Sequence, residues 1–97
     1  MRVRYTIDAL FQIAAIHSYI NERNPIAATR VVGRIRSAAE RLGESPQIGH
    51  AGAAAGTREW VVVGLPYVIV HELDSSQDEI VILGVYHGAR LRPGQES

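Results

Sequence analysis

A stripe of apolar residues between positions 28 and 42 is the most regular feature of the sequence and limits its fold most strongly. Asn24 can cap a helix here because its side-chain oxygen accepts a first-turn N–H, and Pro25 suits the first helical position. Gly43 is the expected stop. The stripe predicts an amphipathic helix that buries one face. Its members recur at three- and four-residue intervals: Ala28, Val31, Val32, Ile35, Ala38, Ala39 and Leu42.

A second helix is predicted directly before this one, from Asp8 to about Arg23, with Thr6 or Asp8 as its cap. The short link at Asn24 joins the two helices into an antiparallel hairpin. In this first helix, the residues that follow helical spacing are Leu10, Ile13, Ala14, Ile16, His17 and Ile20. Three further residues widen the apolar arc beyond one buried stripe: Phe11, Ala15 and Tyr19.

Strand-like segments lie on both sides of the hairpin. Residues 2–5 alternate in the manner of a short edge strand, and residues 44–56 form a loop rich in glycine and alanine. Three runs rich in Val, Ile and Tyr follow at 57–64, 67–74 and 79–87, with links short enough for an antiparallel meander. We therefore predict one α+β domain over residues 1–97: an N-terminal strand, then an antiparallel helix hairpin packed on a three- to four-stranded antiparallel sheet.

Alternation along the strands predicts two faces for this sheet. A helix hairpin covers only one of them, so the other is expected to be an apolar patch with ionisable residues, typical of an interaction surface. The first face of residues 67–74 carries Tyr67, Ile69, His71 and Leu73, opposite Val68, Val70 and Glu72; in the last strand Val81, Leu83, Val85 and His87 share a face opposite Ile80, Ile82, Gly84 and Tyr86.

Composition and charge exclude several classes of function for this chain. The 97 residues include no cysteine, which excludes disulfides and thiol catalysis. The net charge is zero, but residues 1–43 hold seven arginines against three acids, and residues 44–89 hold one arginine against six. This dipole suits a charged protein partner better than bulk nucleic acid. Apolar runs such as residues 60–63 are far too short for a membrane span, and we expect no membrane association.

Chemical motifs are scarce. The four histidines are widely spaced, and no nucleophile elbow or phosphate loop is present, so we expect no metal and no cofactor. One cluster remains, which could perform acid–base chemistry on RNA or could serve only the structure, with Arg58 pairing to Glu59 or Glu72. Its members are Arg58, Tyr67, His71, Tyr86, His87 and Arg90. The arginines Arg30, Arg34 and Arg41 line the outer face of the second helix, typical of a solvated face.

Five segments in order resemble the RelE/ParE toxin superfamily, and specifically its ParE-like branch. The resemblance covers about residues 6–93 and implies the fold predicted above. It also implies a toxin encoded beside an antitoxin in a bacterial type II toxin–antitoxin operon, acting in the cytoplasm. The segments are Asn24-Pro25-Ile26-Ala27-Ala28, Leu42-Gly43-Glu44-Ser45-Pro46-Gln47-Ile48-Gly49, Gly56-Thr57-Arg58-Glu59, Pro66-Tyr67-Val68-Ile69-Val70 and Ile82-Leu83-Gly84-Val85-Tyr86-His87-Gly88-Ala89-Arg90.

Two targets divide this superfamily. ParE-like members are associated with poisoning of DNA gyrase, and we expect that non-enzymatic action here, with no catalytic residues. RelE-like members cut messenger RNA in the ribosome; that alternative implies Arg58, His87 and Arg90 as catalytic groups. Acidic Glu59 and Glu72 would repel RNA phosphate, whereas His71, where ParE-like sequences often have Tyr, departs from the branch. Candidate target-binding residues are Arg58, Tyr67, His71, Tyr86, His87, Arg90 and Arg92.

The resemblance also implies a ParD-like antitoxin whose C-terminal segment wraps the toxin, with one helix in the groove of the hairpin and an extended part near the sheet. We expect no direct sequence-specific DNA binding by this chain. Phe11 and Tyr19 could instead complete the core of the toxin. Candidate antitoxin contacts are Phe11, Ala15, Tyr19, Arg30 and Arg34.

Overall fold

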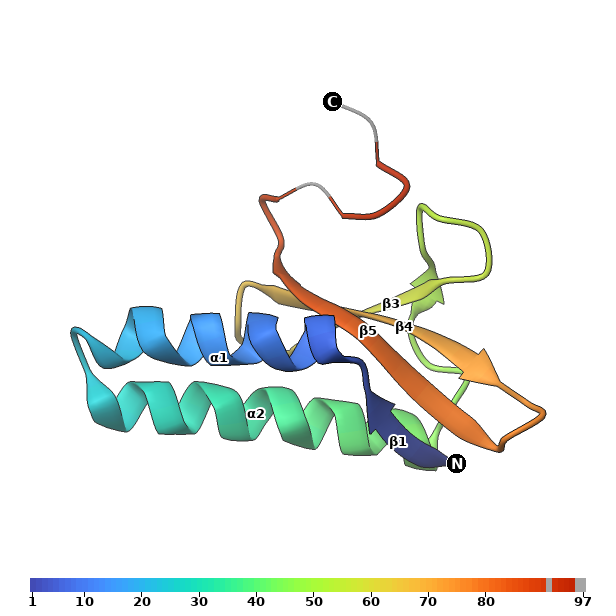
Figure 1. The fold of residues 1–97 in the computed structure, drawn as a ribbon, viewed down its shortest axis with the longest axis horizontal. Coiled ribbons are helices and arrows are strands. Elements are labelled where there is room, and N and C mark those ends of the chain that lie inside the picture. The colour runs from blue at the N-terminus through green and yellow to red at the C-terminus, as the bar shows by residue number, and fades with distance from the viewer. Residues whose placement is uncertain (91, 96–97) are drawn as a thin grey trace.

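The computed structural model describes residues 1–90 and 92–95. Two helices lie side by side as a hairpin against one face of a twisted sheet (Figure 1). In this described part, no helix has the length and apolarity needed to cross a bilayer. The elements are β1 (Arg2–Tyr5), α1 (Ile7–Asn21), α2 (Pro25–Glu44), β2 (His50–Ala51), β3 (Arg58–Val61), β4 (Tyr67–Asp74) and β5 (Glu79–His87).

The sheet has five strands in the order β1-β5-β4-β3-β2, and four of them form the antiparallel part. The predicted fold class is confirmed, with two additions. The N-terminal strand β1 pairs with β5 in parallel, so the sheet is mixed. The two-residue strand β2 lies within the segment predicted to be a loop, where His50 and Ala51 pair with the start of β3.

The helix caps follow the sequence prediction closely. Thr6 Oγ1 accepts the Ala9 N–H at 3.1 Å, and Asn24 Oδ1 accepts the Ala27 N–H at 3.1 Å. Each bond satisfies one of the unpaired donors of a first helical turn. Pro25 occupies the first turn of α2, as predicted.

The prediction that Gly43 stops the second helix was wrong, because α2 continues through Glu44. Gly43 is buried beneath the N-terminus: a Cβ placed on it would lie 2.7 Å from the Met1 carbonyl oxygen. The Met1 ammonium group also donates to the Gly43 carbonyl at 2.9 Å. The glycine therefore allows the backbone at the start of β1 to approach α2 closely.

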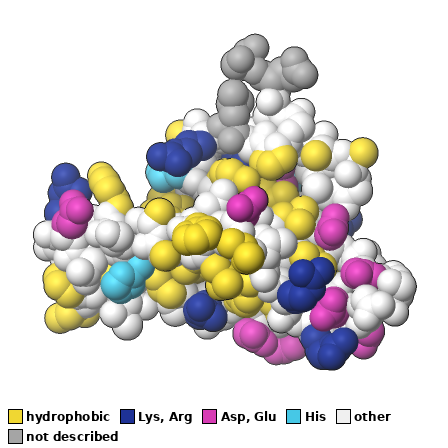
Figure 2. Space-filling model, viewed as in Figure 1, with side chains coloured by type: hydrophobic (Ala, Val, Ile, Leu, Met, Phe, Trp, Pro, Cys, Tyr) yellow, Lys and Arg dark blue, Asp and Glu magenta, His cyan; other side chains and the backbone are white. Residues whose placement is uncertain are grey.

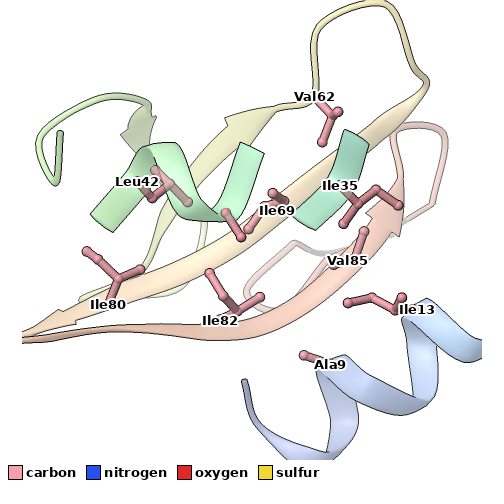
Figure 3. Close-up of a cluster of buried hydrophobic side chains, with 10 residues drawn as sticks. Ala9, Ile13, Ile35, Leu42, Val62, Ile69, Ile80, Ile82 and Val85 are labelled. Atoms are coloured by element: carbon pink, nitrogen blue, oxygen red, sulfur yellow. The ribbon is translucent and has the colours of Figure 1, made fainter. Parts of the chain in front are cut away.

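The apolar stripe of α2 forms the centre of the core. Leu42, Ile35, Ala39 and Ala28 are fully buried, as the periodicity predicted. Val31, Val32 and Ala38 flank the core and are half-buried. Figure 3 shows this core between the two helices and the sheet. Its members are Ala9 and Ile13 of α1, Ile35, Ala39 and Leu42 of α2, Val62 after β3, and Ile69, Ile80, Ile82 and Val85 of the sheet.

Helix α1 buries less than predicted. Ala9 and Ile13 are buried, but Leu10 is 45% exposed and Ala14 is also exposed. The helix packs against α2 and against β5, so only a narrow line of its surface faces the core. The two predicted apolar positions fall outside that line.

A β-bulge in β5 changes the face pattern predicted for the last strand. Val70 pairs with Gly84 but His71 pairs with Ile82, which leaves Leu83 as an extra residue. Beyond the bulge the alternation is shifted by one, so Val85 joins Ile80 and Ile82 in the core. The prediction that Val85 lies opposite those two residues was therefore wrong.

Side chains from the start of α1 stabilise this bulge. Thr6 Oγ1 donates to the Leu83 carbonyl at 3.2 Å, and the Val85 N–H donates to Gln12 Oε1 at 2.8 Å. The strand β1 ends its pairing at Ile82, so these two groups continue along the edge of β5 where β1 stops. A Cβ on Gly84 would lie 2.7 Å from Gln12 Oε1, so a larger residue here would displace the Gln12 side chain from its bond to Val85.

Candidate functional site

Four of the predicted site residues gather where β4 begins and β5 ends. Tyr67 and His87 lie opposite each other in the β4–β5 register, with their rings edge to face and centroids 5.8 Å apart. They line a cavity of about 530 Å³ with Tyr86 and Arg90, and α1 supplies its other wall through Ala15, Ile16 and Tyr19. We call this cavity the sheet-end pocket.

Hydrogen bonds from three successive backbone N–H groups fix the segment that follows β5 at the sheet-end pocket. The Gly88 N–H donates to the Pro66 carbonyl at 2.7 Å, and the Arg90 N–H donates to the His87 carbonyl at 2.9 Å. The Ala89 N–H donates to Nδ1 of His87 at 3.1 Å, which leaves Nε2 as the protonated nitrogen of the neutral ring. His87 and Arg90 are exposed, so both can reach a partner.

Arg58 and His71 form a separate pair farther along the sheet. They lie opposite each other in the β3–β4 register. His71 is four residues from Tyr67 on one strand, roughly 13 Å at the usual strand rise. Arg58 donates to the carbonyls of Gln47 and Gly49 at 2.8 and 3.1 Å, so its guanidinium holds the segment that follows α2. In the register of the sheet, the Arg58–His71 pair thus lies four positions along β4 from the Tyr67–His87 pair.

His71 is fully buried, and neither ring nitrogen has a hydrogen-bond partner within residues 1–90 and 92–95. Burial lowers its pKa below the usual value, and the Arg58 charge lowers it further. The imidazole is therefore held neutral at pH 7 and is out of reach of a substrate.

This buried histidine predicts a stability that falls in mild acid. The unfolded chain takes up a proton near pH 6.5 and the folded chain only at lower pH, so the free energy of unfolding decreases as pH falls below 6.5. The slope from one such group is at most about 1.4 kcal/mol per pH unit. His71→Leu should flatten the curve between pH 7.5 and 5.5 in urea unfolding. The variant keeps the other three histidines, and equal slopes in the two proteins would contradict this account.

Arg92 is engaged within the chain. Its Nε donates to Oε1 of Glu59 at 3.0 Å, and its side chain also donates to the Gly88 and Arg90 carbonyls. Glu59 is 4% exposed and His50 Nε2 lies 3.8 Å from the same oxygen. From the sequence, Glu59 was expected to pair with Arg58 or to repel RNA phosphate, and its bond to Arg92 was not predicted.

The contact between Arg92 and Glu59 changes the expected character of the second sheet face. Glu59 lies opposite Val70 in the register, so its side chain is on the second face. Because Arg92 bonds to Glu59, the C-terminal segment around Arg92 lies over this face. Gly94 also packs closely on Ala53 and Ala54. Val68 and Val70 are buried, contrary to an exposed apolar patch across the whole face. Among the described residues, the exposed large hydrophobic side chains near this face are Val61, at the end of β3, and Val63, which follows it.

Helix α1 instead presents an uncovered apolar surface, which we call the α1 stripe. Phe11 is 69% and Tyr19 is 63% exposed, so the alternative that they complete the core was wrong. The Arg23 guanidinium lies 5.1 Å from the centre of the Tyr19 ring. Figure 2 shows hydrophobic side chains gathered over α1 on this face of the molecule. The α1 stripe consists of Ile7, Leu10, Phe11, Ala14, Ala15 and Tyr19.

The other predicted antitoxin contacts lie on a different surface. Arg30 and Arg34 are exposed on α2, and the Arg34 guanidinium donates to the Val63 carbonyl beside β3. Phe11, Ala15 and Tyr19 therefore belong to one candidate surface, and Arg34 belongs to another. Within the described residues, no three metal-ligating side chains come together.

Comparison with known proteins agrees with this geometry. Residues 3–92 match the family described as ParE toxin of type II toxin-antitoxin system, parDE. Toxin RelE2 of Caulobacter vibrioides is 39% identical over 93% of this chain and 98% of its own. A chain in the chromosomal ParDE system of P. aeruginosa has a TM-score of 0.74 at 20% identity, covering 90% of this chain and 95% of that one. A chain in the E. coli RelBE complex has a TM-score of 0.64 at 13% identity, covering 92% of this chain and 98% of that one.

These similarities extend over nearly the whole of each chain, and the two solved neighbours share the helix hairpin and sheet described above. The chain therefore belongs to the ParE toxin family of type II toxin–antitoxin systems, within the ParE/RelE superfamily.

Proposed function

We propose that this toxin acts in the bacterial cytoplasm by binding and poisoning DNA gyrase, and that a ParD-like antitoxin neutralises it. The observation that carries the proposal is that the Arg58–His71 pair lies four positions along β4 from the Tyr67–His87 pair. Cleavage of RNA needs a base, an acid and cations within reach of one phosphate. Arg58 is committed to two backbone carbonyls, and buried His71 is inaccessible, so the sheet lacks that assembly around a single point.

A surface suited to a protein target remains at the sheet-end pocket. It combines tyrosine side chains with the exposed cation of Arg90, and aromatic residues with arginine are enriched at protein interfaces. We assign target binding to Tyr67, Tyr86, His87 and Arg90. Arg92 supports this region from within the chain, because its guanidinium bonds to the Gly88 and Arg90 carbonyls.

One observation favours a second candidate, a RelE-like ribosome-dependent endoribonuclease. His87 and Arg90 both line the sheet-end pocket, so a titratable ring and a cation lie beside two tyrosines. Such a group could transfer protons if the ribosome supplied the remaining catalytic groups. The relative named Toxin RelE2 is consistent with this alternative.

Induced synthesis of the toxin in a bacterial host separates these candidates. Under the gyrase proposal, cells filament and induce DNA-damage signalling while protein synthesis continues at first. Under the endoribonuclease alternative, translation stops within minutes and primer extension maps cuts within codons. Such cuts would defeat the proposed function.

Arg90 provides a test at the level of one residue. Arg90→Ala is expected to weaken target binding about thirtyfold, the effect of losing an interfacial hot-spot arginine, and to abolish growth inhibition. The melting temperature should remain unchanged because the side chain is exposed. Arg92→Ala is the matched control: it leaves the buried Glu59 carboxylate without its arginine and should lower the melting temperature. An Arg90→Ala protein that remains fully toxic excludes Arg90 from the target surface.

A further inference from the structure

A buried carboxylate links the sheet to the C-terminal segment. Glu59 lies in β3 and is 4% exposed, so water cannot solvate an ionised side chain there. Arg92 supplies the opposite charge: its Nε donates to Oε1 of Glu59 at 3.0 Å, and only 14% of the arginine side chain is exposed. The two residues form a charge-assisted bond across 33 positions of the sequence, which we call the Glu59–Arg92 pair.

The Arg92 guanidinium also bonds to the segment that carries Arg90. Its Nη1 donates to the carbonyls of Gly88 and Arg90, each at 3.3 Å. A guanidinium is planar, and its five N–H donors have fixed directions relative to one another. The bond from Nε to Glu59 therefore sets the orientation in which Nη1 meets the two carbonyls.

The turn at residues 88–90 depends on this contact because its residues are exposed and packing restrains them little. At the start of the turn, the Gly88 N–H is held by the Pro66 carbonyl. At its end, the Arg90 carbonyl is tied to β3 through Arg92. The backbone from which the Arg90 side chain projects is therefore oriented by a carboxylate inside the protein.

The backbone around Arg92 is itself held in place. The Arg92 N–H donates to Oε1 of Gln95 at 2.7 Å, and the Gln95 N–H donates to the Arg92 carbonyl at 2.9 Å. Gly94 has a φ of 88°, and its approach to Ala54 leaves no room for a Cβ, so this turn packs closely on the loop before β3. The Arg92 side chain therefore projects from a backbone that is fixed on the sheet.

We propose that Glu59 is a positioning residue for target binding: its carboxylate fixes the Arg92 guanidinium, which holds the turn at residues 88–90. In that conformation the turn presents the Arg90 side chain to the target. This inference rests on the proposed function, which assigns Arg90 to target binding. It extends the functional set to a carboxylate that is too buried to touch the target itself.

The test compares Glu59→Gln with the unmodified toxin. Glutamine has nearly the shape of glutamate but lacks the charge that strengthens the bond to Arg92. In NMR measurements, the Arg92 Nε–H and the Arg90 amide should each exchange with solvent at least about tenfold faster. Affinity for purified gyrase should fall about tenfold or more, and growth inhibition should weaken with it. Affinity for the antitoxin encoded beside the toxin should stay within about threefold.

Glu72→Gln is the matched control. It makes the same chemical change at a half-buried carboxylate of β4 and leaves the Glu59–Arg92 pair intact, so each measurement should change less than about threefold. A double variant shows whether Glu59 acts through Arg92. Glu59→Gln with Arg92→Gln should weaken gyrase binding no more than either single change, because both break the same pair, whereas independent contributions would multiply.

Several outcomes overturn the positioning role of Glu59. One is a Glu59→Gln toxin that binds gyrase and inhibits growth as the unmodified toxin does. Equal losses of gyrase and antitoxin affinity are another, because they indicate a general loss of folded protein, and multiplied losses in the double variant are a third.

The proposed function can fail separately. If the unmodified toxin does not bind gyrase, that function is wrong, and growth inhibition by Glu59→Gln then decides the positioning role: weaker inhibition supports it and unchanged inhibition overturns it. Should Glu59→Gln fail to fold by circular dichroism, Arg92→Lys replaces it. Lysine keeps a positive charge beside Glu59 but cannot bond the carboxylate and both carbonyls at once, so the same loss of target binding is expected. An Arg92→Lys toxin with unchanged target binding overturns the proposal.

Discussion

Leu42→Ala is expected to lower the free energy of unfolding by about 2–5 kcal/mol, the range for deleting a fully buried leucine side chain. Leu42 has no exposed surface and packs in the core shared by α2 and the sheet (Figure 3). A domain of this size has a total stability of about 5–15 kcal/mol, so one substitution removes a large fraction of it. Urea unfolding followed by circular dichroism gives the value directly.

Leu10→Ala is the matched control for this experiment. It makes the same chemical change in the other helix, but the Leu10 side chain is 45% exposed. A partly exposed side chain loses less transfer free energy and leaves no closed cavity, so the expected cost is about 1 kcal/mol or less. Equal losses in the two variants would show that the buried side of the hairpin is not the one described here.

The helices and their caps could be predicted because their signals are local. The α2 stripe, Asn24 and Pro25 act within a few residues of one another, and the structure follows them. The parallel pairing of β1 depends on β5, more than seventy residues away along the chain. No periodicity within residues 2–5 specifies that pairing. Gly43 was misread for the same reason, since its small size serves a contact with Met1.

The bulge at Leu83 shows the same limit within one strand. Alternation assigns faces correctly only while each residue has one partner, and an extra residue shifts every position beyond it. The bulge depends on bonds from Thr6 and Gln12, which lie on another element. A polar side chain such as Gln12 gives no local indication that it will bond to a distant strand.

The candidate site was predicted in part. Tyr67 and His87 meet because the short turn after Asp74 sets the register of the β4–β5 hairpin, and a turn is a local signal. Arg58 and His71 are neighbours of each other but lie away from the sheet-end pocket, because distance along a strand separates residues that share a face. The bond between Arg92 and Glu59 joins the tail to a strand 33 residues away and could not be inferred from spacing.

The α1 stripe leads to the second large effect. Phe11→Ala combined with Tyr19→Ala is expected to weaken antitoxin binding about a thousandfold, because each aromatic anchor at a hot spot contributes about 2 kcal/mol or more. Both side chains are more than 60% exposed in the free toxin, so its melting temperature should change little. Affinity is measured with the full antitoxin on the purified toxin.

Growth inhibition gives an independent reading with Phe11→Ala alone, because Tyr19 also lines the sheet-end pocket. Phe11 is not among the residues that line this pocket, so the single variant should remain toxic while the antitoxin restores growth less completely. Phe11→Leu is the control, because it keeps most of the apolar area and should preserve rescue by the antitoxin. If the alanine variant is still rescued and still binds tightly, the antitoxin does not use the α1 stripe.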